Sequence, residues 1–175
     1  TDVVLINIHT GSYATPQGPG TDFNTIFGSA IAGQSNLSGY PAGTVNRRVF
    51  AALGQNGGTA MSRGNWQSAS SQILNEPSYV NVAAQDNLDI STRQLSVTVE
   101  AYYTGSSPVN TNKINVALMQ NNIEGPQTGA SNNPTAILPN GNYNHQHMLR
   151  HMLTGQWGDD ITNTSSGSFF TDTYT

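Results

Sequence analysis

The chain has 175 residues, a hydrophobic fraction of 35% and a formal net charge of -4, so it can form one domain or two small ones. Its 6 Lys and Arg residues are scattered along the chain, which argues against the basic stripe that binding to nucleic acid requires. The sequence has no cysteine, which excludes disulfides, thiolate nucleophiles and thiolate metal ligands within this chain.

The first part of the chain predicts alternating strands and helices. Residues 3–9 are aliphatic and β-branched and predict a buried strand, followed by a Gly/Pro/Ser loop over residues 10–20. Asp22 can cap a short helix through Ile31, Pro41 should open a strand, and a second helix is predicted from Ser62 to Leu74. The apolar run Val3-Val4-Leu5-Ile6 begins directly after Thr1 and Asp2, with no initiator Met, so we expect a processed or excised piece of a longer protein. The order strand, helix, strand, helix favours an α/β module over residues 1–76.

After Pro77 the apolar residues recur with the two-residue period of strands. Strands are predicted at residues 79–82, 95–103 and 114–119, and a long polar loop at 121–142. One or two further strands begin at Tyr143, and another lies at Phe169. Short strands joined by polar turns favour an antiparallel β-sandwich over residues 77–175.

The segment from Tyr143 to Gly158 combines aromatic, imidazole and guanidinium groups. At the period of a strand, Tyr143 and the three histidines of this segment share one face with two leucines. Neutral imidazoles bind Zn and Cu, so a metal site made by His145, His147 and His151 is one interpretation. The favoured alternative is a half-buried sheet face on which the imidazoles form hydrogen bonds, and we therefore assign no metal and no cofactor.

Two arginines are further candidates for binding, because Arg47 and Arg150 each lie in a stretch with little opposite charge. Each can hold a carboxylate of a ligand, or can instead anchor a loop through backbone carbonyl groups. Ser12 lies close to His9, but the glycine-flanked spacing of a serine nucleophile is absent. We assign no catalytic residue.

Four segments together give a resemblance to a known family. They are Ile8-His9-Thr10-Gly11-Ser12-Tyr13-Ala14, Gly39-Tyr40-Pro41-Ala42-Gly43-Thr44-Val45-Asn46-Arg47, Asn121-Asn122-Ile123-Glu124-Gly125-Pro126-Gln127 and Tyr143-Asn144-His145-Gln146-His147-Met148-Leu149-Arg150. The chain resembles the twenty-eight-kilodalton outer-membrane lipoprotein family of Gram-negative anaerobes, without the N-terminal part of such proteins.

The resemblance implies a partial thioredoxin-like module at residues 1–76 and an immunoglobulin-like β-sandwich at residues 77–175. It also implies a surface lipoprotein regarded as an adhesin or receptor rather than an enzyme, with its lipid anchor outside this chain. Where family members have a Cys-x-x-Cys pair, that pair precedes this region, and Pro41 would correspond to the proline, often cis, that faces it.

We therefore expect a non-catalytic, adhesin-like or receptor-like binding module at the outer membrane or cell surface. The expected partner is a host or extracellular protein or a glycan. An alternative is the cysteine-free remainder of a thioredoxin-like thiol-disulfide oxidoreductase, with Pro41 at the wall of its active site. The candidate ligand-binding residues are Arg47, Tyr143, His145, His147 and Arg150.

Overall fold

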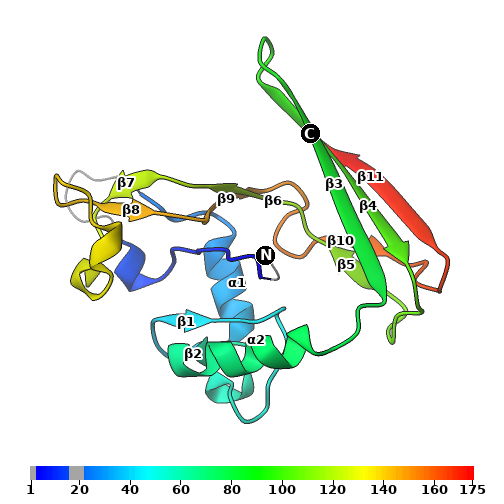
Figure 1. Ribbon diagram of the computed structural model, residues 1–175, viewed down its shortest axis with the longest axis horizontal. Coiled ribbons are helices and arrows are strands. Elements are labelled where there is room, and N and C mark those ends of the chain that lie inside the picture. Colours follow the sequence, from blue (N-terminus) through cyan, green and yellow to red (C-terminus); the bar gives the residue numbers. More distant parts are fainter. Residues whose placement is uncertain (1–2, 16–21) are drawn as a thin grey trace. The chain divides into compact units, whose positions relative to one another are not determined.

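The computed structural model describes residues 3–15 and 22–175, so residues 16–20 of the predicted loop 10–20 lie outside the described residues. The described chain is mostly β-structure in small antiparallel sheets, with few helices (Figure 1). Within this part of the chain, none of the helices is both long and apolar enough to cross a bilayer.

The elements follow one another along the chain with short connections. The α-helices are α1 (Gly28–Ser35) and α2 (Trp66–Leu74), and 3-10 turns occur at Ser12–Ala14, Gln55–Gly57, Arg63–Asn65, Ala130–Asn132 and Pro134–Ala136. The strands are β1 (Ala42–Gly43), β2 (Met61–Ser62), β3 (Val80–Asp89), β4 (Gln94–Tyr103), β5 (Asn112–Ile114), β6 (Ala117–Gln120), β7 (Ile123–Gly125), β8 (Tyr143–His145), β9 (Met148–Met152), β10 (Asp159–Ile161) and β11 (Phe169–Tyr174).

The chain forms two compact units. The first contains Thr1–Asn75 and Ala117–His151, and the second contains Glu76–Val116 and Met152–Thr175. The sequence predicted a division into residues 1–76 and 77–175, whereas residues 117–151 group here with the first unit. Since compactness alone does not define a domain, the predicted domain boundary stays a prediction.

In the first unit, α2 packs on the short hairpin of β1 and β2. A buried cluster of Phe50, Met61 and Ala69 forms the core, and the Trp66 ring packs against it. The Trp66 indole N–H donates to the Met61 carbonyl at 3.1 Å, which ties the start of α2 to β2. The predicted second helix is confirmed, although it starts at Trp66 after a 3-10 turn and not at Ser62.

Two predictions for the N-terminal part are wrong. Residues 3–9 form no strand, because the segment meets its neighbours only through isolated bridges at Asn7 and His9, and residues 3–6 are exposed. The first helix begins at Gly28, because Asp22 closes a local turn by accepting from the Asn24 N–H at 2.9 Å. Ile26 is 84% exposed, so the apolar residues before Gly28 do not form one helical face.

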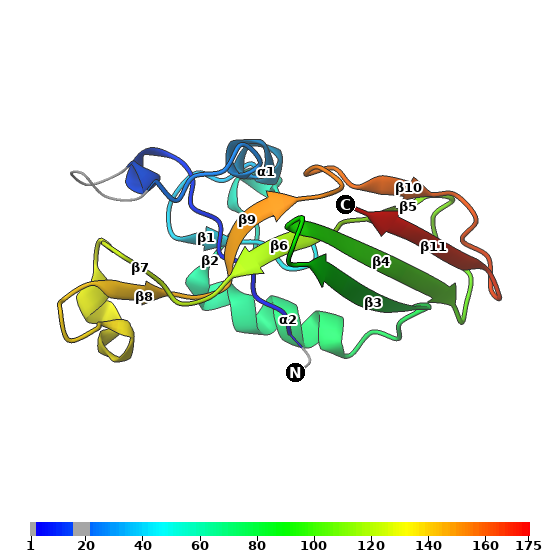
Figure 2. The same ribbon diagram turned by 90° about the horizontal axis from the view of Figure 1, so that it is seen from above.

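The second unit is sandwich-like, with a sheet in the order β11-β4-β3 and a two-stranded sheet of β10 and β5 (Figure 2). All of its strand pairs are antiparallel. Alternate residues of β4 are buried, among them Val97, Val99 and Ala101, and they pack with Val116 and Ile161. The two-residue period of this region is therefore a true strand signal.

Candidate functional site

Segments that are far apart in the sequence meet in the first unit at the hairpin of β7 and β8. The register pairs Ile123 with His145 and Gly125 with Tyr143, so the third and fourth segments of the family resemblance lie side by side. The first segment joins them through His9, whose ring lies 5.2 Å from that of His145. These contacts make this hairpin the candidate site.

The centre of the site is an aromatic and imidazole cluster that we call the His9–His145 cluster, made by His9, Phe23, Tyr143 and His145. The His145 ring centroid lies 4.7 Å from that of Phe23 and 5.0 Å from that of Tyr143. His9 also packs on Phe23, with ring centroids 5.4 Å apart. His145 is fully buried, so the cluster holds β8 against the N-terminal part of the unit.

Some polar side-chain atoms of the cluster have hydrogen-bond partners and others have none. The Nε2 of His145 lies 3.3 Å from the Pro126 carbonyl oxygen, to which it donates when it carries the proton. The Tyr143 hydroxyl accepts from the Asn133 side-chain amide at 2.8 Å. The Nδ1 atoms of His9 and His145 are buried and have no hydrogen-bond partner among the described residues.

The electrostatics of the cluster favour neutral imidazoles. Burial lowers the pKa of His145, while hydrogen bonds to the backbone of Pro126 and Gly125 act in the opposite direction. Burial also lowers the pKa of His9, and the neighbouring His145 lowers it further. Both rings are therefore neutral at pH 7, and they act as packing groups that resist protonation.

The structure does not bring His145, His147 and His151 together on one face. His147 has a φ of 55°, which interrupts the strand alternation between β8 and β9. His145 is buried while His147 and His151 are exposed, and the His151 ring packs on Phe27 at 5.2 Å. In residues 3–15 and 22–175, no group of three or more His, Asp or Glu side chains can hold a metal ion.

The remaining candidate residues lie at exposed positions. Arg47 has a φ of 49°, and partial burial lowers the pKa of its guanidinium. Arg150 lies exposed on β9, and the Tyr40–Pro41 peptide bond is cis. A side chain at Gly11 would overlap the Tyr40 ring, so the first and second segments of the resemblance also touch.

Sequence reasoning missed a network of side-chain amides around the same hairpin. We call it the amide array, and its members are Asn121, Asn122, Glu124, Asn140, Asn142, Asn144 and Gln146. Glu124 accepts from Asn140 at 2.6 Å and from Asn142 at 2.7 Å. The density of Asn and Gln in residues 121–146 is the available signal, but it predicts only a polar loop at 121–142 followed by a strand from Tyr143.

At the base of the hairpin the amide array fixes the backbone. The side-chain oxygen (Oδ1) of Asn122 accepts from the side-chain amides of Gln146 at 2.9 Å and of Asn144 at 3.4 Å. The Asn121 side chain accepts from the backbone N–H of His147 at 2.7 Å. Hydrogen bonds to Asn142 and Asn140 lower the pKa of Glu124, so its carboxylate stays charged and keeps both amides in place.

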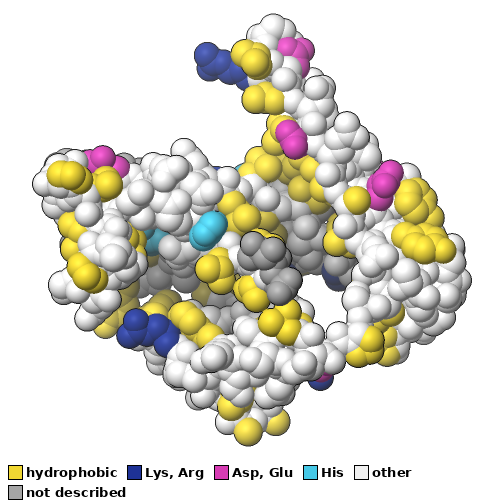
Figure 3. Space-filling view, in the orientation of Figure 1, with side chains coloured by type: hydrophobic (Ala, Val, Ile, Leu, Met, Phe, Trp, Pro, Cys, Tyr) yellow, Lys and Arg dark blue, Asp and Glu magenta, His cyan; other side chains and the backbone are white. Residues whose placement is uncertain are grey.

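The amide array presents side-chain amides, held by the charged Glu124 carboxylate, at exposed or half-buried positions on the hairpin that carries the His9–His145 cluster. On the face of the molecule shown in Figure 3, charged side chains are few and scattered. Such a surface can form hydrogen bonds with a polar ligand.

Comparison with known proteins identifies a family for this chain. A family model described as outer membrane protein Omp28 matches residues 29–175. No curated protein and no solved structure matches the chain. The match contains the second, third and fourth segments of the resemblance and covers most of the chain. The chain therefore belongs to the Omp28 family of outer membrane proteins, and its location is the outer membrane.

Proposed function

We propose that this chain is a non-catalytic binding module of the outer membrane with an adhesin-like or receptor-like role. The observation that carries the proposal is the amide array on the hairpin of β7 and β8. A host or extracellular protein or a glycan is the partner, because such molecules offer the hydroxyl and amide groups that Asn and Gln side chains bind.

The order of the amide array supports a binding role. Asn140 and Asn142 are already held by Glu124, and Asn144 and Gln146 are held by Asn122. Binding normally costs about 0.5–1.5 kcal/mol for each side chain that becomes fixed. Side chains that are fixed before the ligand arrives avoid part of that cost, and their remaining hydrogen-bonding groups face the ligand.

The proposal also includes the finer assignments that the family resemblance implies. These are attachment to the membrane through a lipid anchor outside this chain, a partial thioredoxin-like module and an immunoglobulin-like sandwich. The sandwich-like second unit supports the last of them. Metabolic labelling of the natural protein with a fatty acid tests the anchor, and an unlabelled protein would remove this part of the proposal.

The binding proposal is tested with arrays of glycans and of purified extracellular matrix proteins. We expect the wild-type chain to bind members of one array, and Glu124→Ala to weaken this binding about ten-fold, because it releases two ordered amides. The matched control is Asn110→Ala, which removes an exposed amide from the second unit. Equal binding by wild type and Glu124→Ala, or no binding to either array, would remove the proposal.

A further inference from the structure

Strand β3 forms one edge of the three-stranded sheet in the second unit. It pairs with β4 along Val80–Asp89, and its other side has no strand among the described residues (Figure 1). Residues 81–89 are all exposed. A long exposed edge strand is a template for pairing with another chain unless the protein protects it.

The register identifies the backbone groups at the free edge. The Tyr103 N–H donates to Ser168 at 2.9 Å and the Tyr103 carbonyl accepts from Gly167 at 2.8 Å, so both groups point away from β3. Val80, opposite Tyr103, therefore also points its backbone groups away from β4. By alternation, the same holds along β3 for Val82, Ala84, Asp86 and Leu88.

The side chains of these four residues lie on the face of the sheet that β4 buries. Val82 pairs with Ala101 and Ala84 pairs with Val99, both of which are almost fully buried. Val82 is nevertheless 68% exposed and Leu88 is 56% exposed. The apolar face of the sheet therefore extends from β4 onto β3, where its side chains are exposed to solvent.

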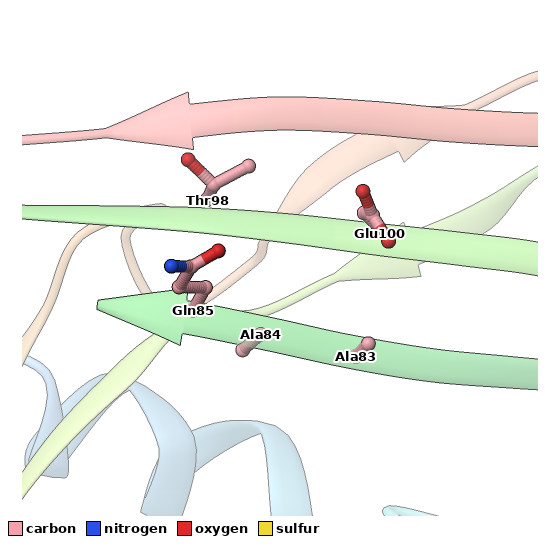
Figure 4. Close-up of a pocket in the computed structure, with 5 residues that line it drawn as sticks. All are labelled: Ala83, Ala84, Gln85, Thr98 and Glu100. Carbon is pink, nitrogen blue, oxygen red and sulfur yellow. The ribbon is translucent and has the colours of Figure 1, made fainter. Parts of the chain in front are cut away.

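The opposite face of the sheet has a shallow pocket with an acidic group. The side chains of Ala83, Gln85, Thr98 and Glu100 lie on this face and line it, and Ala84, between Ala83 and Gln85 on β3, borders it (Figure 4). Ala83 lies opposite Glu100, and its small side chain leaves the space between the edge and the carboxylate open. A strand added to β3 would have its Cα atoms about 10 Å from those of β4, a distance that a Lys or Arg side chain and Glu100 can cover together.

The acidic side chains at the β3 edge determine which kind of strand can pair with it. Asp86 lies on the apolar face and Glu100 on the pocket face, and residues 77–92 contain no Lys or Arg. A second copy of β3 would bring more acid and no base, so the acidic groups disfavour pairing between two copies. A basic strand from another protein would satisfy them on both faces.

We propose that β3 accepts an extended, basic segment of another protein as an added strand, with Lys or Arg side chains paired to Glu100 and Asp86. Backbone hydrogen bonds to β3 would supply affinity, and the two acids would select the partner. This surface lies apart in the sequence from the amide array, and either proposal can fail without the other.

The test uses the whole chain and a synthetic strand-length peptide of alternating valine and threonine with central lysines. We expect binding that protects the amide protons of Val82, Ala84, Asp86 and Leu88 from exchange, measured by nuclear magnetic resonance. Glu100→Gln should weaken binding about two- to five-fold, as for exposed ion pairs. Ala84→Pro should abolish it, since proline removes an outward N–H at an edge position that tolerates proline.

Two control peptides keep the test independent of how the variants fold. A peptide with glutamates in place of the lysines, and one with alternate backbone amides N-methylated, should both fail to bind the unchanged protein. Equal binding of the lysine and glutamate peptides, protection of other amides, or no binding would overturn the proposal. Protection of the β3 amides in the free protein that rises with its concentration would also overturn it, because it would show pairing between copies.

Discussion

His145 is fully buried, and the cost of burying its charged form outweighs its hydrogen bonds to the backbone of Pro126 and Gly125, so its protonation should oppose folding. Its pKa is lowered in the folded state by burial, from about 6.5 in the unfolded chain. Below about pH 6.5 the unfolded chain therefore binds a proton that the folded chain does not, and stability falls as the pH falls. We expect His145→Phe to reduce the loss of thermal stability between about pH 7.5 and 5.5, measured by circular dichroism.

Phenylalanine can keep the ring contacts of His145 with Phe23 and Tyr143, so His145→Phe should fold. The matched control is Met148→Leu, a buried substitution without a titrating group. It should keep the full pH dependence of the wild type whatever it costs in stability. An unchanged pH dependence in His145→Phe would contradict the role assigned to this ring.

Tyr103 in the second unit offers a test of a single buried hydrogen bond. It is 1% exposed, its hydroxyl donates to the Asn112 side chain at 2.9 Å, and its ring stacks on Tyr79 with centroids 6.4 Å apart. We expect Tyr103→Phe to lower the free energy of unfolding by about 1 kcal/mol in urea denaturation.

The neighbouring Tyr102 provides the control for this measurement, because it is 48% exposed on the other face of β4. Tyr102→Phe should change the free energy of unfolding by less than about 0.5 kcal/mol. If both variants lose the same stability, the hydrogen bond of Tyr103 contributes nothing.

Among the elements, β7 depends on a glycine where it meets the His9–His145 cluster. A Cβ at Gly125 would overlap the Phe23 ring, which itself packs on His145. We expect Gly125→Ala to destabilise the protein by about 1–3 kcal/mol, because either β7 or Phe23 must move. Thermal unfolding measures the change.

Helix α1 contains a glycine, Gly33, at which a side chain would have free space, unlike Gly125. A Cβ at Gly33 would meet nothing within 4 Å, and the residue is exposed within the helix. Gly33→Ala should therefore stabilise the protein by about 0.5–1 kcal/mol, since alanine restricts the unfolded chain and favours a helix. A loss of stability in this variant would contradict an exposed Gly33 with no atoms close to its Cβ position.

The elements also show which sequence signals were sufficient. The alternation of β4 and the apolar stripe of α2 predicted their type, because burial on one side enforces the period of each. The apolar residues 3–6 did not form a strand, since a strand needs a partner that their own sequence cannot reveal. The alternation from Tyr143 failed at His147, where a left-handed backbone conformation reverses the faces and leaves no trace in side-chain periodicity.

At the scale of the whole molecule, the site could be predicted only in part. The sequence singled out Tyr143 and His145, and separately His9, but it did not predict that His9 and Phe23, from a distant part of the chain, pack against His145. It also grouped His147 and His151 with His145, although the backbone turns them to solvent. Packing between distant segments determines which residues contact His145 and which histidines are exposed. A single sequence does not show which distant segments meet.

The division into two units gives a prediction about folding. The second unit is interrupted by residues 117–151, yet the two ends of that insertion are close together. The Leu153 N–H donates to the Val116 carbonyl at 2.9 Å, and the Val116 N–H donates to the Thr154 hydroxyl at 3.0 Å. A short glycine linker can therefore join Val116 to Met152 without displacing either.

We expect residues 76–116 joined in this way to residues 152–175 to fold alone, because both buried clusters of the sandwich use residues of these ranges. Circular dichroism should show antiparallel strands, and nuclear magnetic resonance should show dispersed amide signals. All 4 histidines lie outside these ranges, so the midpoint of thermal unfolding should change little between about pH 7.5 and 5.5, unlike that of the whole chain. A disordered spectrum would mean that the sandwich requires the inserted segment, and a strong pH dependence would place the acid-sensitive step outside the His9–His145 cluster.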